Sequence, residues 1–365
     1  MPVLRRITVR DFRNIALQEL EFSGNINCIS GNNGEGKTNL MDAIYYLSMT
    51  KSAFSTSDKF NFRYGTHSFA VSGVYDMPSG VTSRFSIQVD DSGEKKIRRD
   101  DKTVTKAADH IGVLPVVMVS PSDISLVSES GDERRKFVNS VISQLDREYL
   151  TALQQYNRLL AQRNTYLKER LSDELLLDTL DERLEKLAEP VYAGRVKLVE
   201  DLNPVVSEYY SQLSSGREQV RITYKSDLHK SGLADILRAS REKDRILKYT
   251  SSGIQRDDFI FEMNGYPIRR CGSQGQQKSF LVSLKFAQYD LMRTAYGYPP
   301  LLLLDDLFDK LDMDRTSNML KMVAGNDFGQ IFLSDSNKVR LQSIVDGITA
   351  DRTYYVTSGG VFSRV

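Results

Sequence analysis

The strongest constraint on the fold is a glycine-rich loop, residues 31–38, which matches the pattern G-x-x-x-x-G-K-[ST] at every position. An apolar run, residues 26–30, leads into the loop, and residues 39–47 follow it with apolar side chains at helical spacing. A strand, a glycine loop and a helix in this order predict a parallel α/β sheet with a phosphate-binding edge. The candidate binding residues are Gly31, Asn32, Asn33, Gly34, Glu35, Gly36, Lys37 and Thr38.

These residue types suit the binding of a nucleoside triphosphate. Glycine lets backbone N–H groups approach phosphate oxygens with no Cβ in the way, and the dipole of the following helix favours an anion. We expect Lys37 to reach the β- and γ-phosphates and the Thr38 hydroxyl to bind Mg²⁺. The loop therefore predicts ATP and Mg²⁺ as cofactors.

A second apolar run, residues 301–304, ends in two acids, Asp305 and Asp306. A buried strand delivers such carboxylates to its C-terminal end. We expect Asp305 to hold Mg²⁺ directly or through water, and Asp306 to orient or deprotonate the attacking water. By itself the run also fits a core strand that ends in a turn, but its combination with the glycine loop favours the catalytic interpretation.

A third polar segment, residues 272–279, opens a predicted helix shortly before this strand. The Ser273 hydroxyl, the backbone of Gly275 and the helix N-terminus would form a second anion cradle. With Gln276, these residues resemble the S-x-G-Q core of the signature motif of ABC-type ATPases; the alternative is an ordinary polar helix start. In that superfamily the motif closes over the γ-phosphate bound by the partner subunit. The resemblance therefore implies a homodimer that forms with ATP.

The ATP-site motifs lie at both ends of the chain, with different material between them. Residues 68–105 contain β-rich runs and turn residues, which predict an antiparallel sheet. Residues 128–245 show helical spacing, without the sustained heptads of a long coiled coil. We expect an α/β fold of the ABC-type P-loop ATPase head, with a mixed sheet and an antiparallel β subdomain. Residues 1–127 and 246–365 would form this domain, and 128–245 an inserted, mainly helical lobe.

The composition excludes several classes of protein. Among 365 residues, 49 are Lys or Arg and 48 are Asp or Glu, so any nucleic-acid contact must come from a local patch of cations. The two cysteines, Cys28 and Cys271, are too few for a disulfide framework, and we expect reduced, buried thiols in a cytoplasmic protein. No apolar run approaches the length of a membrane span, so we expect no membrane partner.

The motifs in combination are similar to the RecF family of bacterial recombination-mediator ATPases. The family resemblance implies an ATP-dependent dimer that binds double-stranded and gapped DNA. It also implies a role in DNA repair, replication and the SOS response: helping RecO and RecR to load the recombinase RecA at single-strand gaps and stalled forks. The matching segments are DFRN (11–14), GNNGEGKTN (31–39), VSPSDISLVSESGDERRKFVN (119–139), YNRLLAQRN (156–164), QRDD (255–258), GSQGQQKS (272–279) and LLLLDDLFDKLD (301–312).

By position, the resemblance implies further roles. Arg13 would lie near the nucleotide, Asp123 in the Q-loop region, and Phe308 to Asp312 in the D-loop. The chain departs from the ABC pattern, because the Q-loop segment has no glutamine and no switch histidine follows the run 330–335. We interpret these departures as slow hydrolysis, suited to a timer or clamp with weak, DNA-stimulated ATPase activity.

The DNA-contacting residues are less defined by the sequence. Candidate cations are Lys51 and two clusters: Arg134, Arg135 and Lys136, and Lys95, Lys96, Arg98 and Arg99. Each cluster also fits a solvated surface face. An alternative function is the ATPase of a phage-defence or overcoming-lysogeny type nuclease system, although only about 60 residues follow the second motif, too few for a nuclease domain. The ATP subunit of a transporter fits less well, because it carries the switch histidine.

Overall fold

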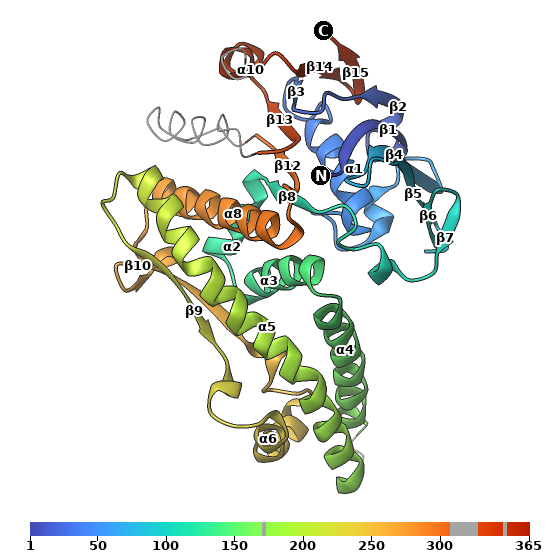
Figure 1. Ribbon diagram of the computed structural model, residues 1–365. Coiled ribbons are helices and arrows are strands. Elements are labelled where there is room, and N and C mark those ends of the chain that lie inside the picture. The colour runs from blue at the N-terminus through green and yellow to red at the C-terminus, as the bar shows by residue number, and fades with distance from the viewer. Residues whose placement is uncertain (170–172, 307–327, 346–348) are drawn as a thin grey trace. The chain divides into compact units, whose positions relative to one another are not determined.

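The computed structural model describes residues 1–169, 173–306, 328–345 and 349–365 (Figure 1). Contacts among them divide the chain into two compact units: Met1–Ile124 with Lys285–Val365, and Ser125–Leu284. The first unit thus joins both ends of the chain. The return to it lies inside helix α8 (Gln274–Tyr296), and not at residue 246 as we expected from the sequence.

The first unit contains a mixed sheet with the strand order β15-β14-β3-β13-β12-β8. Its neighbouring strands run parallel, except for β15, which forms an antiparallel hairpin with β14. Every residue of β3, β8, β12 and β13 is buried, as expected of apolar strands covered on both faces. The bounds are β3 (Ile26–Ser30), β8 (Val116–Val119), β12 (Leu301–Leu304), β13 (Ile331–Asp335), β14 (Arg352–Ser358) and β15 (Val361–Arg364).

A second, antiparallel sheet in this unit has the order β2-β1-β4-β5-β6-β7. It confirms the antiparallel sheet predicted over 68–105. Helix α1 (Lys37–Met49) contacts strands of both sheets, and most of its residues are buried, so it lacks a polar face. The strands are β1 (Val3–Phe12), β2 (Ile15–Glu21), β4 (Ser68–Asp76), β5 (Thr82–Asp90), β6 (Lys95–Arg99) and β7 (Lys102–Val104); short helices are η1 (Asp58–Asn61), η2 (Ala107–Asp109), η3 (Pro121–Ile124) and α10 (Lys338–Val345).

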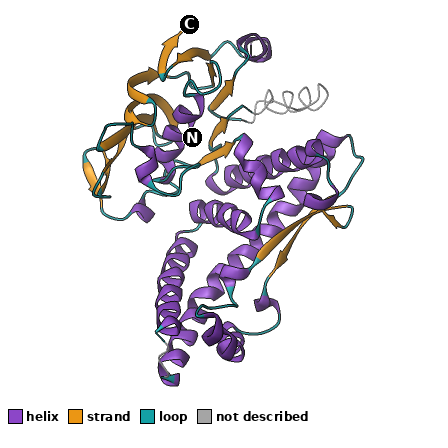
Figure 2. Ribbon diagram, turned by 180° about the vertical axis from the view of Figure 1, so that it is seen from behind, coloured by secondary structure: helices purple, strands orange, loops and turns teal. Residues whose placement is uncertain are grey.

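The second unit is mainly helical but also contains a small sheet, β11-β10-β9 (Figure 2). Strand β10 pairs along its whole length with β9, which lies deep within the predicted insertion. Residues after 246 therefore fold with the insertion, which explains the shifted border. The elements are α2 (Ser125–Ser128), α3 (Gly131–Leu145), α4 (Arg147–Lys168), α5 (Glu174–Ser214), β9 (Val220–Lys225), η4 (Asp227–His229), α6 (Leu233–Leu247), η5 (Ile254–Arg256), β10 (Asp258–Met263), β11 (Tyr266–Pro267) and α7 (Ile268–Cys271).

A buried ionic cluster ties three helices of the second unit together. Arg163 on α4 is fully buried; its Nε lies 2.7 Å from Oδ1 of Asp181 on α5, and its Nη1 lies 2.8 Å from Oδ2 of Asp244 on α6. Arg163 also donates to the Thr250 hydroxyl. A buried guanidinium requires such a set of partners, because burying an unpaired charge is costly.

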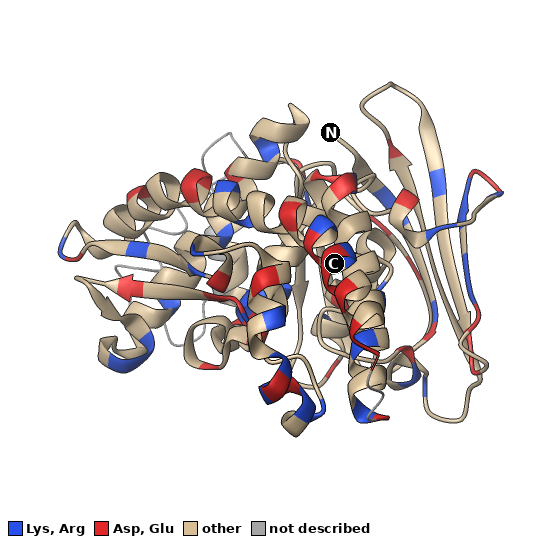
Figure 3. Cartoon of the chain, turned by 90° about the horizontal axis from the view of Figure 1, so that it is seen from below, with Lys and Arg blue, Asp and Glu red and all other residues tan. Residues whose placement is uncertain are grey.

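Two expectations from composition can be compared with the structure. Cys28 is buried as expected, but Cys271 is exposed, because it ends the four-residue helix α7 at the surface. Within the described ranges, no helix combines the length and apolarity needed to cross a bilayer. Acidic and basic residues are interspersed along the elements (Figure 3), in keeping with the net charge of +1.

Candidate functional site

The loop between β3 and α1 has the backbone conformation that its glycines permit. Gly34 and Gly36 have positive φ angles of 85° and 106°, which residues with a Cβ rarely adopt. A Cβ at Gly36 would lie only 2.9 Å from side-chain atoms of Asn14, whereas a Cβ at Gly34 would meet no atom of the described residues within 4 Å. The loop is therefore packed on one side and open on the other, at a pocket.

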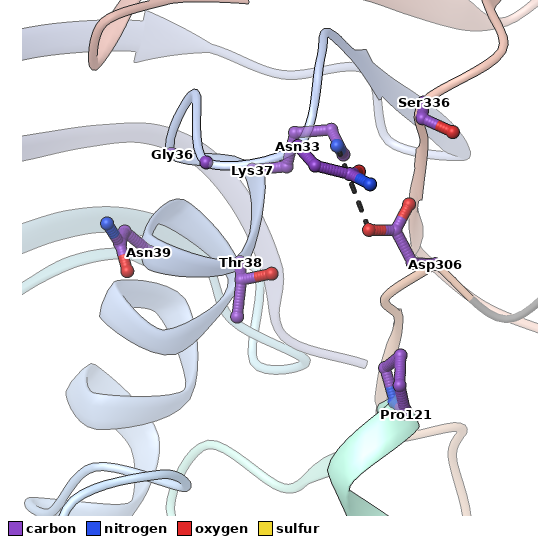
Figure 4. A pocket seen from close by; sticks show the side chains of 9 residues that line it. Asn33, Gly36, Lys37, Thr38, Asn39, Pro121, Asp306 and Ser336 are labelled. Carbon is purple, nitrogen blue, oxygen red and sulfur yellow. Dashed lines mark ion pairs between the residues drawn. The ribbon is translucent and has the colours of Figure 1, made fainter.

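That pocket has a volume of about 390 Å³ and contains the ammonium group of Lys37 (Figure 4). Lys37 is 3% exposed; its Nζ donates to the loop carbonyls of Gly31 and Asn32, over 2.9 and 3.2 Å. The same Nζ lies 3.7 Å from Oδ2 of Asp306, across the pocket. The pocket is lined by Asn33, Gly34, Gly36, Lys37, Thr38, Asn39, Pro121, Asp306 and Ser336.

Beside the pocket, three side chains from three elements form a hydrogen-bonded chain. The Thr38 hydroxyl donates to Oδ2 of Asp305 over 2.7 Å, and the Ser334 hydroxyl donates to Oδ1 over 2.5 Å. Asp305 is 1% exposed, and burial raises its pKa, although the two hydroxyl donors oppose the shift. The N–H of Asp306 donates to Ser334 Oγ, so one serine holds both acids.

The C-terminal hairpin supports the phosphate loop from behind. The carbonyl of Glu35 accepts hydrogen bonds from the Thr357 hydroxyl and the Gly360 N–H, each 2.9 Å long, and the Glu35 carboxylate accepts one from the Gly359 N–H. A Cβ at Gly31 would lie 2.6 Å from the carbonyl oxygen of Thr357. Residues from the two ends of the chain therefore fix the loop together.

Arg13 contacts Asn39, which lines the pocket. Its guanidinium pairs with the buried Asp42 at 2.8 Å and donates to Oδ1 of Asn39, a pocket residue, over 3.2 Å. It also donates to Ser52 and Asn61. Burial raises the pKa of Asp42, and the Arg13 charge opposes that shift. Arg13 thus positions α1 and Asn39 rather than lining the pocket itself.

The signature-like segment belongs to the other unit and forms the start of α8. The Ser273 hydroxyl accepts from the Gln276 N–H over 3.3 Å, and the Gln276 side chain accepts from the Ser273 N–H over 2.8 Å. This reciprocal pair is a capping box, which satisfies two backbone donors. Gln276 also donates to Glu218, and Gly275 is half-buried beside it. Ser273 is exposed, so its surface is open to contact.

The remaining residues implied by the family resemblance have ordinary partners. Asp123 accepts from the Ser120 N–H over 2.8 Å and lies 3.2 Å from Lys285 Nζ. The D-loop residues 308–312 lie outside the described residues. Where a switch histidine follows the strand in transporter ATPases, this chain has Ser334 and Asp335, and Ser334 contacts both acids of the site.

The candidate DNA-binding cations are partly committed to the fold. Arg134 is 3% exposed and forms a two-pronged ion pair with Asp258, at 2.8 and 3.1 Å, so it is a structural residue. Lys95 pairs with Asp58 and caps the Thr50 carbonyl. Arg98, in contrast, is exposed on β6.

Sequence reasoning missed several residues of the site. Asn39, Pro121 and Ser336 line the pocket, and Ser334 holds the two acids. Pro121 and Ser336 follow buried parallel strands, and Ser334 is the last residue but one of such a strand. Ligands of open α/β sheets bind outside the carboxyl ends of the strands. The sequence signal that could have found these site residues is therefore the polar or turn residues at and just after the end of each predicted strand.

Comparison with known proteins shows the family of the chain. The family model described as RecF/RecN/SMC N terminal domain matches residues 3–344. The DNA replication and repair protein RecF of Bacteroides fragilis is 40% identical over 361 residues, which cover 98% of both chains. The protein of the same name from Parabacteroides distasonis is 42% identical over 358 residues, again 98% of both chains.

Solved structures show the same relationship. The recombination mediator protein RecF, solved with ATP, superposes with a TM-score of 0.90 and 28% identity, covering 100% of this chain and 98% of that chain. The Smc head domain from Pyrococcus furiosus shares the fold alone, at a TM-score of 0.59 and 15% identity, with 100% and 96% coverage. Because relatives named RecF match its full length at about 40% identity, and because it has the same mixed α/β head with a helical lobe, this chain belongs to the RecF family.

Proposed function

We propose that the chain binds ATP in the pocket between the phosphate loop and the end of β12. The observation that carries the proposal is the Thr38–Asp305 hydrogen bond, because it joins the hydroxyl and the carboxylate that a nucleotide-bound Mg²⁺ requires. The solved relative with ATP, 28% identical over the whole chain, supports the assignment.

The residues of the pocket fit a triphosphate. Lys37 is a buried cation whose hydrogen-bond partners are carbonyls of the loop itself, so its ammonium can turn towards phosphate oxygens without leaving the pocket. The open side of Gly34 leaves room for the backbone N–H groups to approach an anion. Lys37, Asn33 and Asn39 would hold the phosphates, and the residues 31–36 would wrap around them.

Thr38 and Asp305 would hold Mg²⁺, which supplies charge neutralisation for the β- and γ-phosphates. The fit rests on their existing contact, since the two oxygens are 2.7 Å apart at the wall of the pocket. Asp306 has its N–H fixed by Ser334 and its carboxylate in the pocket near Lys37, and it would orient or deprotonate the attacking water. We propose slow hydrolysis, because a serine stands where ABC transporters have a histidine.

We further propose that ATP joins two copies of the chain. The exposed Ser273 at the capped N-terminus of α8 would contact the nucleotide of the partner subunit, with Gly275 and Gln276. A helix N-terminus favours an anion, and a hydroxyl adds a hydrogen-bond donor to phosphate oxygens. The dimer would bind DNA, and hydrolysis would release it.

The cellular role that we propose is that of the named relatives. DNA replication and repair proteins match the chain over 98% of its length, and the solved relative is described as a recombination mediator of the RecFOR pathway. We propose that this chain acts on double-stranded and gapped DNA in the cytoplasm, with RecR and RecO, and thereby helps to load RecA. The full-length agreement with these relatives favours this role over the nuclease-linked ATPase.

Sedimentation with and without ATP, Mg²⁺ and gapped DNA tests the proposal. We expect the parent protein to bind ATP and to dimerise only with it, whereas Lys37→Ala loses both properties, because the buried cation of the pocket is gone. A monomer at saturating ATP and Mg²⁺ would refute the dimer. Equal ATP affinity in Lys37→Ala and parent would refute the site.

A further inference from the structure

Three segments of the family resemblance meet at a second pocket, and of these only the first also contributes to the ATP pocket, through Pro121. These segments are residues 119–139, 156–164 and 255–258. The pocket has a volume of about 290 Å³ and lies wholly within the unit Ser125–Leu284, between α3, α4, α5 and η5. From these segments, its lining includes Asp132, Arg135, Asn139, Tyr156, Asn157 and Gln255.

Two guanidinium groups lie in this pocket. The Arg195 side chain is 2% exposed; its Nη1 pairs with Asp257 at 2.6 Å, and its Nη2 donates to Asn139 over 3.2 Å. The Arg135 side chain is 17% exposed, and burial together with the nearby Arg195 charge lowers its pKa. The Asp257 carboxylate neutralises the buried Arg195, so the partly exposed Arg135 is the guanidinium that an anionic ligand would contact.

The two cations that α3 contributes to this pocket are each paired with a carboxylate of α3. Asp132 pairs with Arg135, and Glu133 pairs with Lys136 at 2.6 Å, each three residues apart on α3. The Asp132 side chain is 69% exposed, although its partner Arg135 is only 17% exposed, so water can solvate the carboxylate when it leaves the pair. An acid from another molecule can therefore displace Asp132 from Arg135 at small cost.

Part of the lining is apolar, which distinguishes two kinds of anionic ligand. Leu153, the ring of Tyr156 and Ile254 face the same pocket as Arg135. A nucleic-acid phosphate makes no use of such a wall, whereas an acidic side chain next to an aliphatic or aromatic one matches both halves. We propose that this pocket docks a peptide segment of a protein partner, in which an Asp or Glu lies beside a large apolar residue.

The test selects ligands without assuming a sequence. A phage library of random heptapeptides is panned on the full-length protein without nucleotide, and enriched peptides are synthesised with a fluorescent label for anisotropy titration. We expect an acid next to Leu, Ile or Phe, and a Kd raised roughly tenfold in Arg135→Gln, because a charge-assisted contact is lost. In Asp132→Asn the Kd falls about two- to fivefold, because the internal competitor is gone.

Arg238→Gln is the matched control, because Arg238 also pairs with an acid three residues away, Asp235, on another helix of this unit. Its Kd should equal that of the parent. If Arg135→Gln fails to fold, Lys136→Gln replaces it, since that side chain is 64% exposed. The proposal is overturned if no peptide is enriched or if the enriched peptides lack an acid. It is also overturned if Arg135→Gln (or its replacement Lys136→Gln) and Asp132→Asn both bind the peptides like the parent.

Displacement of the peptides by labelled single- or double-stranded oligonucleotides, with the same dependence on Lys136, would also overturn it and identify a nucleic-acid site. The assay contains no ATP, so its result does not depend on the proposed nucleotide site.

Discussion

The hydroxyl of Thr38 donates a 2.7 Å hydrogen bond to Oδ2 of Asp305, although 267 residues separate them in sequence. The contact joins the first turn of α1, whose Thr38 lines the pocket, to the end of β12. A valine at position 38 keeps the shape of threonine but removes the oxygen. We expect Thr38→Val to lose the Mg²⁺-dependent part of ATP affinity, whereas Thr38→Ser retains it. Calorimetric titration of ATP with and without Mg²⁺ measures the difference, and an unchanged Mg²⁺ effect in Thr38→Val would contradict the assignment.

We expect the ionised Asp305 to lower the free energy of unfolding at neutral pH, although the proposed Mg²⁺ site requires its carboxylate. Burial raises its pKa above the ordinary value of 3.8, so the folded chain holds the proton more tightly than the unfolded chain does. Its contribution to the free energy of unfolding is therefore greatest below pH 3.8 and falls as the pH rises through the raised folded pKa. Asp305→Asn cannot ionise, so it does not lose this stability as the pH rises. Without nucleotide at neutral pH we expect it to be more stable than the parent by roughly 1 kcal/mol.

Urea unfolding at neutral pH and at pH 4 measures this effect, and the gap between Asp305→Asn and the parent should narrow at the lower pH. A variant that is less stable than the parent at neutral pH would contradict the reasoning. ATP and Mg²⁺ should stabilise the parent and not the variant, because the variant lacks the carboxylate.

The C-terminal hairpin should influence nucleotide affinity through the carbonyl of Glu35. Thr357→Val removes one hydrogen bond to that carbonyl, worth about 1 kcal/mol, so we expect ATP to bind roughly threefold to fivefold more weakly. Thr357→Ser should restore the affinity, because it keeps the hydroxyl. Thr353→Val is the matched control: Thr353 is a buried threonine of the same strand, β14. An equal loss in Thr353→Val would show a general effect of the strand instead.

The sequence predicted those parts of the site that are contiguous, since the loop 31–38 and the pair Asp305–Asp306 carry their chemistry in their own spacing. Contacts from distant segments were beyond its reach. Ser334 belongs to no motif, and its bonds to both acids depend on β13 lying beside β12. The predicted domain border near 246 differs from the observed one for a similar reason. The pairing of β10 with β9 cannot be read from the periodicity of either strand.

The second unit should depend on its buried ionic cluster. Arg163→Ala removes the buried cation that pairs with Asp244 and leaves Asp181 with Arg241 alone, and we expect a loss of about 3–5 kcal/mol in the free energy of unfolding. Arg238→Gln removes the exposed pairs of Arg238 with Asp235 and Asp178 and should change stability by less than about 1 kcal/mol. Chemical unfolding of both variants provides the comparison. Equal stability of Arg163→Ala and parent would show that the cluster is not required.

The signature-like segment provides the test that separates nucleotide binding from dimerisation. Ser273 is exposed at the start of α8 and belongs to a different unit from Lys37, so a change there leaves the phosphate loop of the same chain intact. We expect Ser273→Arg to bind ATP with the affinity of the monomeric parent but to remain monomeric, because a bulky cation would replace a hydroxyl that faces the partner's phosphates. A mixture with Lys37→Ala sharpens the result: one of the two composite sites would combine the intact loop of the first variant with the intact Ser273 of the second. Partial recovery of ATP-dependent association in the mixture, and none in either variant alone, is the outcome expected of a site shared between two chains. Normal dimers of Ser273→Arg with ATP would instead place the segment outside the nucleotide interface.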